Sequence, residues 1–148
     1  MANKNNTSFP SCTVTITLTP EARNFLAGTT AGVSHFAIYN DLLDNMAIVD
    51  TSFSKRGNIV PLLTGQAESS AHSMSERWKL GRKSMVRILS TMDDLGIIRL
   101  HTSRLASISD MLSVDKCQTN DGDICYPDFS NLPPDPQSDE QVQNAEPP

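Results

Sequence analysis

The chain has 148 residues, 20% of them charged, and a formal net charge of −5 at pH 7. This length suits one ordinary domain with an appendage. The sequence holds no apolar run near the roughly 20 residues that span a bilayer, and its first residues lack the apolar stretch of a signal peptide. We therefore expect a cytoplasmic protein without a membrane segment.

The charges are divided unevenly along the chain. Residues 1–116 hold all 12 basic residues and 10 acidic ones, whereas residues 117–148 hold 7 acidic residues and no basic one. Between Arg77 and Arg104, seven basic residues are accompanied only by Asp93 and Asp94. A local basic stripe matters more for phosphate contact than the overall charge does. The acidic total therefore does not exclude a nucleic-acid partner.

The N-terminal part of the chain predicts a strand followed by a short helix. Residues 1–11 are polar and are expected to be disordered. Residues 13–18 alternate between polar and apolar, which is typical of a half-buried strand. Thr19 and Pro20 predict a helix over residues 20–27, because a hydroxyl N-cap precedes a proline at the first helical position.

A loop over residues 28–33 and a longer helix come next. Ser34 is the expected N-cap of this helix, which we expect to reach about Val49. Its apolar residues fall within one arc of the helical projection and predict a face packed in the core. That face consists of Phe36, Tyr39, Leu42, Leu43, Met46 and Ala47.

Residues 58–63 predict a short strand, which Pro61 restricts to an edge. A turn over residues 64–66 then leads into a helix that begins near Ser69. A tight turn at Leu80 and Gly81 ends this helix. The core anchors expected around it are Met74, Trp78 and Leu80.

The next helix, over residues 81–95, is two-sided. One half of its circumference is apolar and is expected to pack: Met85, Val86, Ile88, Leu89, Met92 and Leu95. The other half carries long basic and short hydroxyl side chains, which are the types that reach phosphates and base edges. We expect it to contact DNA through Arg82, Lys83, Ser84, Arg87, Ser90 and Thr91, with Asp94 beyond the duplex. Arg87 is the best candidate to read a base, and Arg82 to contact a phosphate.

Gly96 ends this helix, and a short β-hairpin is expected after it. Its strands are residues 97–100 and 105–108, joined by a turn over residues 102–104. Arg104 would then lie at the hairpin tip, where it is placed to contact the DNA backbone or the minor groove. His101 is expected to face solvent.

From Ser34 to Leu112 the chain resembles the winged-helix N-terminal domains of replication-initiator and replisome-organiser proteins of phages, plasmids and other bacterial mobile elements. The stretches that carry the resemblance are HFAIYNDLLDNMA, LLTGQAESSAHSMSERW and KLGRKSMVRILSTMDDLGIIRLHTSRLASIS. The resemblance implies duplex binding by the second helix, with contacts at Arg82, Lys83, Ser84 and Arg87. Nothing resembles the larger C-terminal replication domain of that family. This favours a small transcription or replication regulator over an initiator.

These observations together predict an α+β fold with a winged helix-turn-helix over residues 34–116. Residues 12–33 would form a strand-helix extension, which is the expected dimerisation element of a homodimer. Residues 117–148 contain six of the nine prolines and predict a disordered acidic tail. The tail would compete with DNA for the basic face or dock a protein partner through Ile124, Tyr126 and Phe129.

Three alternatives remain open at the level of sequence. Residues 13–45 also resemble a ribbon-helix-helix, in which the outward strand residues Thr13, Thr15 and Thr17 would read the major groove from a dimer. A winged helix also serves for protein–protein contact, which an exposed apolar patch on the hairpin or at Ile38 would favour. The third alternative is a structural or packaging accessory.

The sequence predicts no enzyme, no cofactor and no metal site. It contains no GxSxG, HExxH or P-loop motif. No Cys or carboxylate stands at a metal or triad spacing from any of the histidines, which are His35, His72 and His101. The spacing of the cysteines does not suit zinc. We expect Cys12, Cys117 and Cys125 to be free thiols in a reducing cytosol, with a Cys117–Cys125 pair as the alternative in an oxidising setting.

Overall fold

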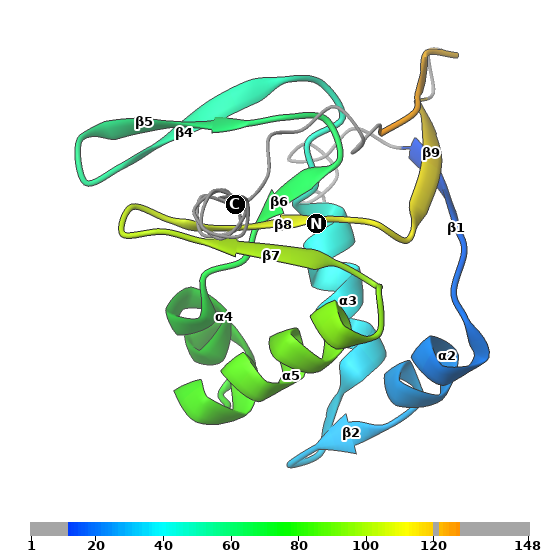
Figure 1. Cartoon of the computed structure of the whole chain (residues 1–148), viewed down its shortest axis with the longest axis vertical. Helices are drawn as coiled ribbons and strands as arrows, with labels where there is room; N and C mark the ends of the chain where they lie inside the picture. Colours follow the sequence, from blue (N-terminus) through cyan, green and yellow to red (C-terminus); the bar gives the residue numbers. More distant parts are fainter. Residues whose placement is uncertain (1–11, 120–121, 128–148) are drawn as a thin grey trace, which may run out of the picture.

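The computed structural model describes residues 12–119 and 122–127 (Figure 1). Within this part the fold is mixed α+β, with four helices and several small antiparallel sheets. The expected α+β class is therefore confirmed. The disorder expected for residues 1–11, and for the tail beyond residue 127, lies outside the described residues. None of the helices described is long and apolar enough to cross a membrane.

The predicted N-terminal strand and helix are confirmed. Strand β1 (Cys12–Ile16) is followed by helix α2 (Pro20–Leu26), and the Thr19 side chain caps α2 by accepting from the Ala22 N–H at 3.1 Å. Helix α2 buries Ala22 and Leu26 in the main hydrophobic core. The extension thus shares its core with the rest of the described chain.

The disordered tail was predicted to begin at residue 117, and this boundary is wrong. The chain forms strands beyond that residue. Strand β9 (Val114–Thr119) pairs antiparallel with β1 on one edge and with β10 (Ile124–Cys125) on the other. Val114 and Cys117 are buried in the core. This burial and the strand pairing offset the entropy lost on ordering the segment. Its polar composition alone would not offset that loss.

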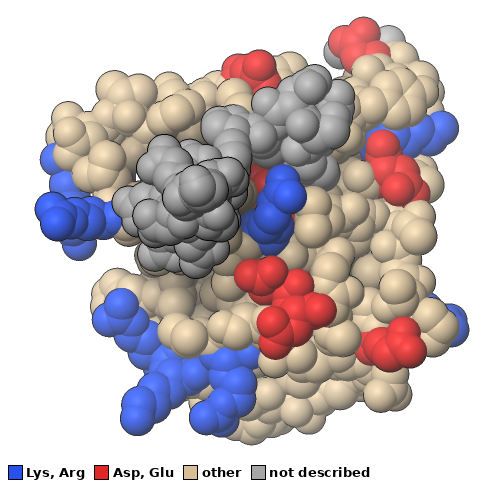
Figure 2. Space-filling model, viewed as in Figure 1, with Lys and Arg blue, Asp and Glu red and all other residues tan. Residues whose placement is uncertain are grey.

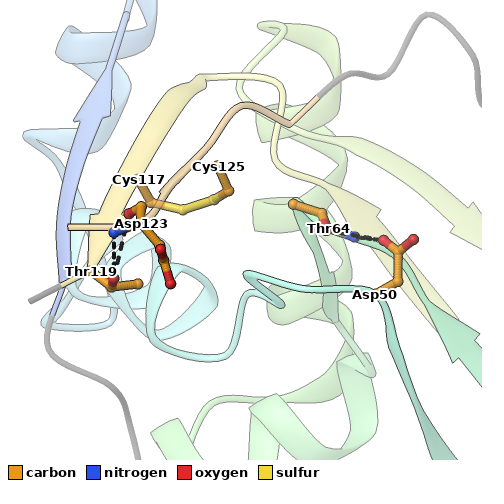
Figure 3. The surroundings of a disulfide bond; sticks show 6 residues. All are labelled: Asp50, Thr64, Cys117, Thr119, Asp123 and Cys125. Carbon is orange, nitrogen blue, oxygen red and sulfur yellow. Dashed lines mark hydrogen bonds between the residues drawn. A yellow bond between two sulfur atoms is a disulfide. The ribbon is translucent and has the colours of Figure 1, made fainter. Parts of the chain in front are cut away.

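The expectation of free thiols is also wrong for two of the three cysteines. Cys117 and Cys125 form a disulfide between β9 and β10 (Figure 3). The turn between the strands is closed by the Asp123 N–H, which donates to Thr119 Oγ1 at 3.2 Å. Pairing brings the two Cα atoms to 5.4 Å, which is within the range of disulfides in proteins.

Helix α3 (His35–Asp44) begins where the sequence predicts and ends five residues early. Ser34 caps it by accepting from the Ala37 N–H at 3.1 Å. The helix stops because the Asn45 side-chain amide donates to the Asp41 carbonyl at 2.9 Å and the chain then turns away. The expected loop before α3 contains a minimal hairpin, β2 (Thr29–Thr30) and β3 (Val33–Ser34).

The predicted buried face of α3 is confirmed at Tyr39, Leu42 and Met46 and is wrong at the start of the helix. Phe36 is 49% exposed, whereas Ile38 is fully buried. His35, a polar residue at the start of the helix, is buried against Phe25. Its Nδ1 donates to the Phe25 carbonyl at 2.8 Å and its Nε2 lies 2.7 Å from Thr30 Oγ1, so both ring nitrogens have partners.

A β-hairpin follows α3, and the sequence predicts only its second strand. Strands β4 (Thr51–Lys55) and β5 (Asn58–Leu62) pair antiparallel and form a two-stranded sheet. The strand at residues 58–63 is thus confirmed and its partner was missed. At the base of the hairpin, Asp50 Oδ1 accepts from the Thr64 N–H at 2.9 Å and from its hydroxyl at 3.0 Å (Figure 3).

The remaining elements include both helices and the hairpin that the sequence predicts. They are β6 (Gln66–Glu68), α4 (Ala71–Trp78), α5 (Arg82–Asp94), β7 (Arg99–Thr102) and β8 (Ser107–Asp110). Strand β6 was expected to be part of a turn and of the approach to a helix. It pairs instead with β8, which gives a three-stranded antiparallel sheet in the order β6-β8-β7. Helices α4 and α5 pack on one side of this sheet (Figure 1).

Candidate nucleic-acid interface

One face of α5 packs in the core, and the opposite face is exposed to solvent at the start of the helix. Met85, Ile88, Leu89 and Met92 are buried in the core, as predicted. Gly81 is the N-cap and provides no side chain to bond the first amides of the helix. Such unpaired N–H groups, together with the helix dipole, favour an anion at this end.

The turn before α5 is fixed by neighbouring elements. Lys79 ends α4 in the left-handed conformation, with φ at 57°. Arg77 and Trp78 both bond to Asp41 on α3, with Arg77 Nη2 at 2.7 Å and Trp78 Nε1 at 2.9 Å from its Oδ2. Trp78 is partly buried against the core, which agrees with its predicted role as an anchor.

The DNA-contact residues expected on α5 differ in how accessible they are. Arg82, Lys83, Arg87 and Ser90 are exposed, whereas Ser84 and Thr91 are half-buried. The Thr91 hydroxyl donates to the Arg87 carbonyl at 2.9 Å and is thereby engaged within the helix. Arg104 is exposed in the turn between β7 and β8, as the sequence predicts.

The basic stripe contains two kinds of cation. Arg77 and Arg99 form ion pairs, Arg77 with Asp41 and Arg99 Nη2 with Asp110 Oδ2 at 2.9 Å. Within the described residues the other five form no ion pair, and they are Lys79, Arg82, Lys83, Arg87 and Arg104. Figure 2 shows basic side chains gathered at one edge of the molecule, over the start of α5 and over the hairpin tips. Within the described part of the chain, no ion pair therefore compensates the charge of these five cations.

A shallow hollow of about 610 Å³ lies along the exposed face of α5. Its lining consists of Arg82, Lys83, Val86, Arg87 and Ser90. Val86 was expected in the core, and that prediction is wrong: it is 46% exposed. An apolar spot among long donors suits a base edge that combines a thymine methyl with hydrogen-bonding groups.

A second hollow, of about 530 Å³, connects α5 to both hairpins. Arg82 borders it as well as the first hollow. The other cations around it are Arg104 from the β7–β8 turn, Lys55 at the end of β4 and Arg56 from the β4–β5 turn. Lys55 and Arg56 are not among the contact residues predicted from the sequence. The signal available was Gly57 beside Asn58 at the start of the predicted strand, because Gly and Asn are common in turns.

A buried polar network supports the sheet behind the hairpin. Asp110 is fully buried and its Oδ2 accepts from His101 Nε2 at 2.8 Å and from Arg99 Nε at 3.0 Å. Its Oδ1 accepts from Gln66 Nε2 at 2.8 Å. Burial raises the pKa of Asp110, but hydrogen bonds from His101, Gln66 and Arg99 outweigh it and lower that pKa below its ordinary value. The prediction of a solvent-facing His101 is wrong, since its side chain is only 19% exposed.

The described residues contain no group of three or more His, Cys, Asp or Glu side chains that could hold a metal ion. His72 is exposed on α4, and its Nε2 lies 3.3 Å from Glu76 Oε2.

No protein-family model matches the chain, and neither a curated protein nor a solved structure matches it.

Proposed function

We propose that this chain binds double-stranded DNA sequence-specifically through a winged helix-turn-helix. In this proposal α4 and α5 are the two helices of the motif, α5 enters the major groove, and the β7–β8 hairpin is the wing. The element order supports it, since α3 and the β4–β5 hairpin are followed by β6, α4, α5, β7 and β8, and so does the sheet order β6-β8-β7. The motif places its second helix in the major groove with its first residues at the bases.

The observation that carries the proposal is the charge at the start of α5. Arg82, Lys83 and Arg87 are exposed, form no ion pair in the described part of the chain, and stand beside an N-cap without a side chain. A solvated helix face usually alternates both signs of charge. Here the acidic residues of α5, Asp93 and Asp94, come only at its end.

Each side chain has a distinct proposed role. Arg87 reads a guanine edge, because its guanidinium fork matches the O6 and N7 acceptors. Arg82, at the rim shared by both hollows, contacts a phosphate, as does Arg104 on the wing. Lys83, Ser84 and Ser90 add contacts to bases or phosphates, whereas Thr91 contributes less because its hydroxyl is already engaged.

Selection of bound sites from random duplex DNA tests this function. The full chain is expected to enrich a defined sequence. The Arg87→Ala variant should bind the enriched site about 1–3 kcal/mol more weakly and tolerate changes at one base position, because it loses a bidentate base contact. The exposed Arg23 on α2 provides a matched control, and Arg23→Ala should bind like the wild type. An unenriched pool would contradict the proposal.

A protein partner is the second candidate for the same surface. Leu105, at the tip of the β7–β8 hairpin, is 41% exposed and Val86 is 46% exposed, whereas Ile38 is fully buried. Only two exposed apolar side chains lie beside five cations that form no ion pair among the described residues, which favours DNA over protein. Binding that hardly changes between 50 and 200 mM salt would support a protein partner, because release of counterions makes DNA binding steeply salt-dependent.

The wider role that we propose is a small transcription or replication regulator of a bacterial mobile element, acting in the cytoplasm as a homodimer. Among the described residues, β9 occupies one edge of β1 and no strand occupies the other, so a second copy could pair there. The ribbon-helix-helix alternative has less support, since β1 is already paired within the chain. The Cys117–Cys125 disulfide is of a kind rare in a reducing cytoplasm, and none of the proposed DNA contacts involves it.

A further inference from the structure

The turn of the β4–β5 hairpin places a cation opposite the β7–β8 hairpin. The tips of both hairpins lie at the same edge of the molecule (Figure 1). Arg56 in the first turn and Arg104 in the second border one hollow, and Arg82 at the start of α5 borders it too. Three cations from separate elements thus surround a space of about 530 Å³.

Arg56 occupies a backbone position where other residues fit better. The turn between β4 and β5 has positive φ at both central residues, 52° at Arg56 and 81° at Gly57. Such turns favour Asn, Asp or Gly at the first central position, and a long side chain there is uncommon. The fold therefore does not require an arginine at this position, and its charge needs another explanation.

The neighbouring Lys55 holds the hairpin in place. Its Nζ lies 3.0 Å from Glu68 Oε2 on β6, so this cation is neutralised within the protein. Arg56 is exposed and forms no ion pair in the described ranges. The hairpin is thus fixed to the central sheet by one cation and presents the next one outward.

We infer that the β4–β5 hairpin is a second DNA-contacting arm, in which Arg56 binds a backbone phosphate of the duplex that α5 reads. This inference rests on the proposed function. With α5 in the major groove, the flanking sugar-phosphate strand runs past the edge where the two hairpin tips lie. A phosphate in the hollow between them meets Arg56, Arg104 and Arg82 together. The arm contributes affinity and register, because phosphate contacts carry no sequence information.

The variant Arg56→Asn in the full chain tests this arm. Asparagine suits the positive φ, so the melting temperature should not fall. Its affinity should be measured between 50 and 200 mM salt on the selected duplex and on a scrambled one. Losing one phosphate contact should make the slope of log K against log salt shallower by about 0.9 and weaken binding about eightfold at 0.1 M salt. The loss should be equal on both duplexes.

Two further variants make the result decisive. Arg56→Lys keeps the charge and should keep the wild-type slope, whereas Arg23→Asn removes an exposed cation on α2 and should also leave it unchanged. A slope for Arg56→Asn equal to that of Arg23→Asn would overturn the arm while leaving the function of α5 intact. If the wild type binds no duplex at all, the proposed function fails, and the arm fails with it.

Discussion

Asp110 connects the strands of the sheet behind the candidate interface through one buried side chain. It lies on β8, and its carboxylate accepts from Gln66 on β6 and from Arg99 and His101 on β7. It therefore joins all three strands of the sheet β6-β8-β7. The cost of burying the charge is met by partners at both oxygens, as a buried carboxylate requires.

Replacing Asp110 with alanine should lower the free energy of unfolding by about 1–3 kcal/mol, because the buried side-chain amide of Gln66 loses its acceptor. The lowered pKa of Asp110 also makes the free energy of unfolding depend on pH. A carboxyl group whose pKa is lower in the folded state stabilises the fold above its ordinary pKa. That contribution is lost as the pH falls below about 4. Urea unfolding at pH 7 and pH 3 should show a smaller acid loss for Asp110→Asn than for the wild type. Parallel losses would contradict this role.

Single-residue features could be predicted from sequence where they depend on near neighbours. The caps at Thr19 and Ser34 are of this kind, since each hydroxyl bonds an amide three residues away. Burial at Phe36 and Val86 was not predictable in this way. Each lies on a helix whose apolar face is wider than the area that neighbouring elements cover. The packing of those elements decides which apolar residues are buried. Val86 is left exposed and lines the hollow along α5.

At the scale of elements, the strands with long-range partners were the hardest to predict. The strand Thr51–Lys55 has one apolar residue, Phe53, and its pairing with β5 defines it. Strand β9 pairs with β1, about 100 residues away in sequence, so no local pattern announces it. By contrast, α4, α5 and the β7–β8 hairpin carry their own periodicity and turn residues. The cations on α5 were therefore predicted, whereas Arg56 was missed together with the hairpin that carries it.

The disulfide between β9 and β10 is the element-scale feature that is easiest to test. Closing a loop of this length restricts the unfolded chain and should contribute about 2–3 kcal/mol. Dithiothreitol should lower the free energy of urea unfolding by that amount. The variant Cys125→Ser should be destabilised equally and should no longer respond to reductant. It is the better variant because Cys117 is fully buried and Cys125 is not. Cys12→Ser should respond like the wild type, and a wild type insensitive to reductant would exclude the bond in solution.

At the scale of the whole molecule, the net charge of −5 is opposite in sign to the local charge of the candidate interface. Residues 128–148 contain five acidic residues and no basic one, and they are Asp128, Asp135, Asp139, Glu140 and Glu146. Without them the net charge of the chain is zero. Like charges between this segment and the duplex repel one another, and the segment is attracted to the cations that we assign to DNA. Both effects weaken non-specific binding and are screened by salt.

Truncation after Pro127 tests whether this opposition matters. The cut retains β10 and the disulfide, which removal of all residues from 117 onward would destroy. The truncated chain should bind scrambled duplex severalfold more tightly at 50 mM salt, and the difference should shrink at 200 mM as the Debye length falls. A full-length variant with the five acids replaced by Asn or Gln separates charge from chain length and should match the truncation. Equal affinities of all three chains at both salt concentrations would show that the acidic segment does not compete with DNA.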